Sequence, residues 1–163
     1  ISSLKHSVMT TTAQIAKHFR DAFFGGNWTF VSLKPTLENV TLEMANTKVH
    51  SLNTIAILVC HINYYVSVQL RVLEGGPLEG SDKLSFAVPE LKNEQDWQDL
   101  LAGFWANAEK FVSLVEKIPD EKLDQDFADP KYGSYHRNLL GIIEHTHYHM
   151  GQISLIKKII AEG

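Results

Sequence analysis

The first regular pattern along the chain is a helical repeat near the N-terminus. Inward-facing positions recur every three or four residues and the pattern stops at Gly25-Gly26, a pair that ends helices. These positions are Val8, Thr12, Ile15, Phe19, Ala22 and Phe23. The spacing predicts a first long helix.

A second stretch, from about Ser51 to Leu73, is apolar on nearly every side. Arg71, near its end, is its one charged residue. More than 20 residues without a turn signal are too many for a strand, in spite of the many β-branched residues. The pattern therefore predicts a buried, central helix.

Two further stretches complete the set of long helices. In one, an amphipathic stripe begins at Trp97, continues to Ile118 and is ended by Pro119. The other is expected to run from about Tyr135 to Ala161. Between the long helices, the sequence predicts a short helix from Pro35 to about Ala45, and a loop over residues 75–90, GGPLEGSDKLSFAVPE. A loop of that length can run along a whole bundle.

These elements predict one all-α domain over residues 1–163, a four-helix bundle with long connections. Of its residues 44% are hydrophobic and 21% charged, and the net charge of -4 argues against a nucleic-acid or acidic-membrane partner. The longest unbroken apolar run, Ile55 to Cys60, is far below the roughly 20 residues of a membrane span, and no signal peptide is recognised. We therefore expect a cytoplasmic protein without a membrane partner. Cys60, the only cysteine, is expected to be a buried, inert thiol.

Candidate chemistry comes from the histidines, of which there are eight. Three lie in the segment HTHYH. Residues four apart on a helix diverge by only about 40°, so His145 and His149 project side by side, whereas His147 points elsewhere. The pair shares its face with the inward positions of the last helix, Leu139, Ile142, Ile153 and Ile156. Both imidazoles are therefore expected inside the bundle.

His61 lies midway along the apolar second helix and offers a third buried imidazole. Three histidines from two facing helices suit a transition metal. The alternatives are a site made by His145 and His149 alone, or core histidines that are satisfied by tyrosine or backbone groups. The remaining histidines are not expected to be ligands: His6, His18, His50, His136 and His147.

Familiar metal motifs do not fit this pattern. In the HExxH motif of zinc proteases a glutamate follows the first histidine, but here that position is Thr146, and Glu144 points about 100° away. A di-iron Glu-x-x-His pair is also missing at His61. The sequence therefore predicts a mononuclear site.

Two segments, LNTIAILVCHINYY and NLLGIIEHTHYHMGQISLIKK, resemble the DinB/YfiT-like family of metalloenzymes. The match consists of a histidine on the second helix and H-x-x-x-H-x-G-Q-I on the last helix, here His61, His145, His149, Gly151, Gln152 and Ile153. The resemblance implies an up-down-down-up bundle, one divalent metal ion (zinc or nickel) on the three histidines, water in the remaining positions, and a homodimer.

The family's activities imply two kinds of reaction on a small molecule: metal-dependent hydrolysis, and transfer or isomerisation that uses a low-molecular-weight thiol. Tyr64, Tyr65 and Gln69 are expected near the open face, and no catalytic residue or general base is assigned. For Gln152 a packing role is favoured over orienting a ligand, because Gly151 beside it indicates a close approach. Since a general base is missing, a non-catalytic metal- or ligand-binding bundle with a stress-associated role stays open as the alternative.

Overall fold

A computed structural model describes residues 8–163, and each of its four long helices begins after a residue whose side chain caps the first turn. The capping oxygen accepts a hydrogen bond from the backbone N–H three residues further on, which has no partner inside the helix. The four helices and their caps are α1 (Thr11–Phe24) after Thr10, α4 (Ile55–Leu73) after Thr54, α6 (Glu94–Val115) after Asn93 and α7 (Tyr135–Glu162) after Ser134.

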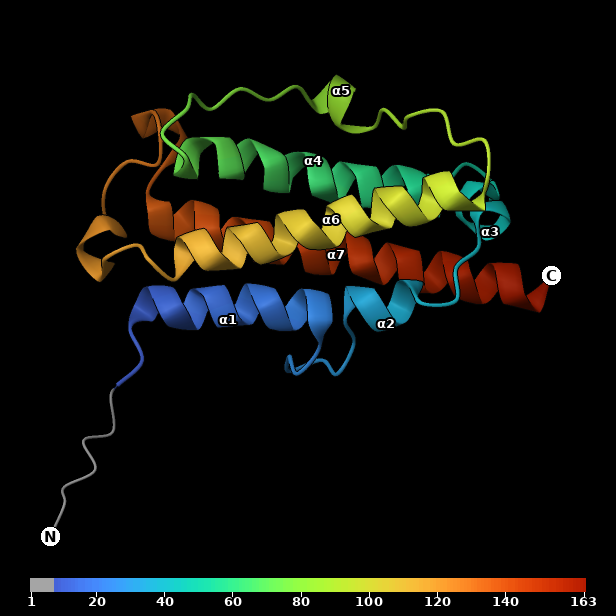
Figure 1. The fold of residues 1–163 in the computed structure, drawn as a ribbon, viewed down its shortest axis with the longest axis horizontal. Helices are drawn as coiled ribbons and strands as arrows, with labels where there is room; N and C mark the ends of the chain where they lie inside the picture. Colours follow the sequence, from blue (N-terminus) through green and yellow to red (C-terminus); the bar gives the residue numbers. More distant parts are fainter. Residues whose placement is uncertain (1–7) are drawn as a thin grey trace, which may run out of the picture.

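The four long helices form a bundle in which α1 and α4 each pack against both α6 and α7 (Figure 1). In that view α1 and α7 run in one direction and α4 and α6 in the other, and the connection from α4 to α6 runs back along the bundle. Within residues 8–163 there is no β-strand, only an isolated bridge between Asp126 and Ser134. The all-α prediction is confirmed.

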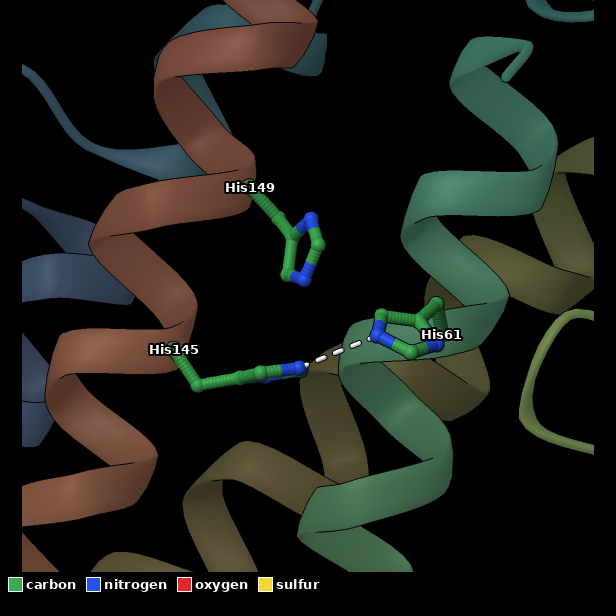
Figure 2. A group of neighbouring side chains, drawn as sticks. All are labelled: His61, His145 and His149. Atoms are coloured by element: carbon green, nitrogen blue, oxygen red, sulfur yellow. Dashed lines mark hydrogen bonds between the residues drawn. The ribbon is translucent and has the colours of Figure 1, made fainter. Parts of the chain in front are cut away.

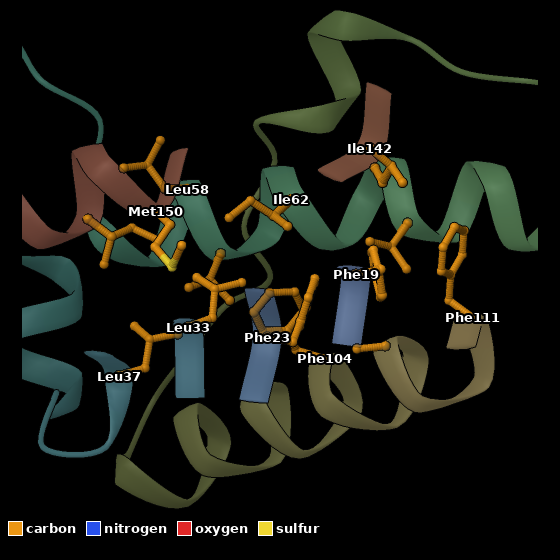
Figure 3. Close-up of a cluster of buried hydrophobic side chains, with 14 of the residues drawn as sticks. Phe19, Phe23, Leu33, Leu37, Leu58, Ile62, Phe104, Phe111, Ile142 and Met150 are labelled. Atoms are coloured by element: carbon orange, nitrogen blue, oxygen red, sulfur yellow. The ribbon is translucent and has the colours of Figure 1, made fainter. Parts of the chain in front are cut away.

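Aromatic rings fill the space between α1 and α6 (Figure 3). The ring of Phe19 lies 4.6 Å from that of Phe23 and 4.3 Å from that of Phe111, and Phe23 meets Phe104 edge-on at 5.1 Å. All four side chains are fully buried. This aromatic cluster fixes α1 against α6, while aliphatic side chains fill the contact between α4 and α7.

Three helix boundaries in the structure differ from those expected from the sequence. Val8 precedes α1 and is exposed, because Thr10 caps the helix and the carboxylate of Asp120 accepts from the N–H groups of Thr11 and Thr12. α4 starts at Ile55 rather than near Ser51, since Thr54 is its cap. α6 ends at Val115, three residues before the predicted Ile118, consistent with the poor fit of helical backbone just before Pro119.

Two connections also differ from expectation. The predicted helix from Pro35 to Ala45 is two helices, α2 (Leu33–Leu37) and α3 (Leu42–Asn46). They are separate because Val40 turns into the core, where its carbonyl accepts a 2.7 Å hydrogen bond from the indole of Trp97. The predicted loop over residues 75–90 contains a short helix, α5 (Asp82–Ser85), capped by Ser81. Two 3-10 turns, Asp120–Lys122 and Pro130–Tyr132, lie between α6 and α7.

α4 is the one helix among residues 8–163 with the length and hydropathy of a membrane span, and 56% of that span is buried inside the bundle. A central core helix has the same composition. This feature is therefore weak support for a membrane partner.

Replacing Phe104 by alanine is expected to lower the free energy of unfolding by about 3–5 kcal/mol, because the fully buried ring leaves a cavity in the aromatic cluster. Urea unfolding followed by circular dichroism measures the loss. The matched control is Phe30→Ala, whose ring is 94% exposed and whose effect should stay within about 0.5 kcal/mol. Equal losses in the two variants would contradict the assignment of the core.

Candidate metal centre

Three histidines from two neighbouring helices meet inside the bundle (Figure 2). His61 comes from the middle of α4, and His145 and His149 come from successive turns of α7. One ring nitrogen of each lies within 4.8 Å of the others, and the Nε2 atoms of His61 and His145 are 3.1 Å apart. The structure thus brings together all three residues singled out in the sequence.

The histidine cluster is shielded by aromatic side chains. His61 and His149 are buried and His145 is half-buried. The ring of Phe86, which follows α5, stacks on His61 at 4.0 Å, and the ring of Tyr65 meets both His61 and His145 edge-on. These contacts limit the positions that the imidazoles can adopt and keep water away from one side of the cluster.

A serine of α5 fixes the proton of His61. The Ser85 hydroxyl donates to the backbone carbonyl of Asp82 at 2.6 Å, so its oxygen is free to accept from Nδ1–H of His61, 2.8 Å away. With the proton on Nδ1, the lone pair of Nε2 faces the cluster. The sequence reasoning missed Ser85 because α5 was expected to be loop. A signal was present: Ser81 followed by Asp82 is a typical helix start.

Gln152 fixes the proton of His149 in the same way. Its Oε1 lies 2.7 Å from Nδ1 of His149, so Nδ1–H donates and Nε2 again carries the lone pair. The side chain therefore orients the histidine, contrary to the packing role favoured from sequence. Gly151 gives no close approach within this chain, because it is exposed and no atom lies within 4 Å of the position of a Cβ.

Unlike His61 and His149, His145 has no side chain that accepts a hydrogen bond from its Nδ1. Its Nδ1 is buried and has no hydrogen-bond partner among the described residues, while its Nε2–H donates to Nε2 of His61, 3.1 Å away. Burial, with the neighbouring His149 and His61, lowers the pKa of His145 to about 4. Burial and His149 also lower the pKa of His61. Two of the three rings are thus disposed to stay neutral near pH 7, the form in which imidazole binds metals.

This donor set fits a divalent transition metal. Ring nitrogens that converge within 4.8 Å, two of them oriented by outer partners, have the composition of a three-histidine transition-metal site. Thr146, at the position of the glutamate in HExxH, is buried and donates to the carbonyl of Ile142. The centre therefore lacks the base of the zinc proteases at that position.

A cavity of about 390 Å³ adjoins His145 between α4 and α7. Its lining includes Tyr65, Gln69, Arg137 and Glu144. The amide nitrogen of Gln69 donates to a backbone carbonyl of α7, whereas its Oε1 is buried without a partner among the described residues. The expectation that Tyr65 and Gln69 lie near the site is correct.

Tyr64 lies elsewhere. Its hydroxyl accepts from the N–H of Ser81, and its ring lines a different cavity, against the connection from α4 to α6. Cys60 lines that second cavity too. Cys60 is half-buried rather than fully buried as expected. Burial nevertheless raises the pKa of its thiol to about 11, consistent with an inert cysteine.

The other histidines of the described residues do not join the cluster. His18, His50 and His136 are exposed, and His147 is half-buried away from it. His6 lies outside the described residues.

Comparison with known proteins gives one match: a sequence model of the DinB superfamily matches residues 27–153. The chain belongs to the DinB superfamily. The matched range covers all three histidines of the cluster, together with Ser85 and Gln152. No curated protein and no solved structure gives a match.

The lowered pKa of His145 predicts a pH dependence of the metal-free protein. Between about pH 6.5 and 4 the unfolded chain takes up a proton at this residue and the folded chain does not, so stability falls as the pH is lowered through that window. Between pH 7 and 5 the full shift corresponds to about 2 kcal/mol, and because the ring is only half-buried, solvent screening reduces this value. The free energy of unfolding should therefore fall by about 1 kcal/mol more in the wild type than in His145→Gln. Urea unfolding at both pH values measures the difference, and identical pH dependences would contradict it.

Proposed function

We propose that His61, His145 and His149 bind one divalent transition-metal ion, zinc or nickel, and that this DinB-superfamily protein is a metal-dependent enzyme acting on a small molecule. The reaction class is hydrolysis, or transfer to or from a low-molecular-weight thiol. No nucleic-acid partner is included in the proposal, because the chain is acidic overall.

The observation that carries the proposal is the orientation of the imidazoles by Ser85 and Gln152. In a metal-free core, each buried imidazole needs hydrogen-bond partners for both nitrogens. Here Nδ1 of His61 and of His149 is satisfied from outside, and Nε2–H of His145 donates to Nε2 of His61, which leaves the buried Nδ1 of His145 without a partner among the described residues. An arrangement of this kind is satisfied by a cation at the centre.

The bound ion would lower the pKa of a coordinated water or thiol towards neutrality, or polarise a substrate carbonyl. The protein supplies the surroundings. Phe86 and Tyr65 exclude water from one side of the histidines. The cavity beside His145 offers a substrate the guanidinium of Arg137, the carboxylate of Glu144 and the free amide oxygen of Gln69. These groups would hold a small polar molecule close to the centre.

One observation favours a second candidate, a non-catalytic bundle that binds a metal ion or small ligand. Thr146 occupies the position where a catalytic glutamate would face the pair of histidines, and its hydroxyl is committed to the helix backbone. Glu144, the acidic side chain of the cavity lining, projects from the exposed side of α7. In its metal-binding form, this candidate differs from the enzyme only in that no substrate is turned over.

Removing the outer partner of a histidine is expected to weaken metal binding. Ser85→Ala and Gln152→Leu should each raise the dissociation constant for zinc by about 10- to 100-fold, because the imidazole loses its fixed proton and orientation. Titration against a competing chelator measures the constant. Gln152→Glu keeps an acceptor and should remain close to the wild type, whereas His149→Ala gives the value for a site with a missing ligand. Unchanged affinity in Ser85→Ala and Gln152→Leu would contradict the proposed orientation.

Catalysis is tested by refilling the metal-free protein with zinc or nickel and assaying ester, amide and thiol-conjugation substrates. Activity should appear with one of these classes and fall by at least about 100-fold in His145→Ala and His149→Ala, since the ion is lost with its ligands. Wild-type protein that binds metal tightly yet turns over none of the substrates would favour the binding bundle. Absence of metal binding would refute the enzyme and would leave, of the second candidate, only a bundle that binds a small ligand.

A further inference from the structure

The connection between α1 and α2 exposes two aromatic rings that are two residues apart. Trp28 is 95% and Phe30 94% exposed, and Val31 beside them is also exposed. In Figure 1 this connection projects away from the four long helices. Single exposed apolar residues are common, but two open rings at the end of one loop form a concentrated apolar surface. We call residues 28–31 the aromatic tip.

The aromatic tip is held in place by the side chain of Asn27, which is buried. The amide nitrogen donates to the backbone carbonyls of Asp21, at 3.0 Å, and Val31, at 2.6 Å. The amide oxygen accepts from the N–H and from the hydroxyl of Thr29. These bonds tie both ends of the tip to α1. The loop's own polar contacts therefore impose the outward position of the rings.

Phe30 adopts a backbone conformation that its side chain does not favour. Its φ of 56° lies in the left-handed region, where a bulky L-residue is strained. The ring contributes little packing in return, because it is 94% exposed. Strained residues of this kind concentrate at binding sites, where the strain holds a side chain in a required position. The fold alone gives no reason for a phenylalanine here.

The segment that carries the aromatic tip is basic, although the whole chain is acidic. Residues 8–37, which contain α1, the tip and α2, have three cations and a single anion, Asp21, whereas the net charge of the chain is -4. The cations are Lys17, Arg20 and Lys34. The next acidic residue, Glu38, follows α2 and lines a cavity against α6. The charge of the whole chain therefore does not describe this face.

Two of the cations lie together at the base of the loop. The charged ends of Arg20 and Lys34 are 5.3 and 5.6 Å from the centroid of the Phe24 ring, and both side chains are exposed. Arg20 precedes the loop in the chain and Lys34 follows it. Positive charge is thus fixed next to the aromatic tip.

A cavity of about 510 Å³ lies between the rings and α1. Trp28 and Phe30 contribute to its lining on one side, and Lys17, His18 and Asp21 on the other. Asp21 pairs with Lys17. All of its lining residues come from α1 and the loop, so no charged group of another described element lines it. Apolar rings beside a polar, basic floor match the boundary between the acyl chains and the headgroups of a lipid surface.

We propose that the aromatic tip docks this protein on the surface of an anionic phospholipid bilayer. Trp28 and Phe30 enter the interface between headgroups and acyl chains, the region that tryptophan prefers. Arg20 and Lys34 face the negative headgroups. The contact is peripheral and leaves α4 in the core of the bundle. The expectation of no membrane partner rested on the charge of the whole chain, and docking does not depend on the metal centre.

The test is co-sedimentation of the full chain with vesicles of phosphatidylcholine, either alone or with about one-third phosphatidylglycerol. The wild type should sediment with the anionic vesicles at least about fivefold more tightly than with the neutral ones. The double variant Trp28→Ala with Phe30→Ala should raise the dissociation constant at least about thirtyfold, because both rings leave the interface. Its unfolding midpoint should be unchanged, since both rings are exposed. Leu155→Ala, at an exposed leucine of α7, is the matched control and should bind like the wild type.

A pair of charge reversals tests the basic surroundings. Lys34→Glu should raise the dissociation constant for the anionic vesicles at least about fivefold, because a cation at the base of the tip becomes an anion. Lys158→Glu makes the same exchange at an exposed position of α7 and should have a much smaller effect. Equal effects of the two exchanges would contradict the assignment of the docking face.

Trp28 also reports insertion directly. Trp97 is fully buried and Trp105 half-buried, so Trp28 is the exposed indole among the three tryptophans. On anionic vesicles its emission should shift to shorter wavelength and its quenching by acrylamide should fall, and Trp28→Ala should abolish both changes. Wild-type protein that stays in the supernatant at every lipid concentration would overturn the proposal. So would a double variant that binds as tightly as the wild type, or binding without a change in emission.

Discussion

The contact between α4 and α7 is the constraint on which the candidate site depends. Aliphatic side chains such as Ile62, Ile142 and Met150 hold the two helices together, and the same contact brings His61 within 3.1 Å of His145. The register between the helices is therefore also the geometry of the site. A shift of α7 by one turn, about 5.4 Å, would separate the imidazoles while leaving apolar residues against apolar residues. The aromatic cluster between α1 and α6 supports this arrangement at a distance, because α6 also packs against α4, and α1 against α7.

Three polar rings in such a core carry a desolvation cost that the surrounding structure offsets only in part. Ser85 and Gln152 satisfy the outer nitrogens of two imidazoles, whereas Nδ1 of His145 has no partner among the described residues. Burial and mutual proximity account for the lowered pKa of His145. Holding three neutral, aligned imidazoles in the core lowers the stability of the metal-free protein. This pattern is expected when a core is arranged around a ligand. α5 contributes to this arrangement, because this four-residue helix in the connection from α4 to α6 places Ser85 beside Nδ1 of His61.

α7 carries different side chains on its two sides. Its inner face carries His145 and His149, and its outer face carries the exposed Tyr148 and Leu155. Because Tyr148 touches His149 and Leu155 shares a cavity with Gln152, whatever covers the outer face also bears on the histidine cluster.

The sequence by itself determined the four long helices, the buried character of α4 and the shared face of His145 and His149, because apolar spacing, capping residues and the 3.6-residue period are local properties. It also indicated His61, through its position in an apolar helix. Only the tertiary structure decided what depends on neighbours distant in the chain: the break between α2 and α3 enforced by Trp97, the existence of α5, and the pairing of Ser85 with His61. The role of Gln152 and the displacement of Tyr64 from the site were decided in the same way. A side chain's spacing along a helix gives its direction, but its hydrogen-bond partner is set by the packing of separate elements.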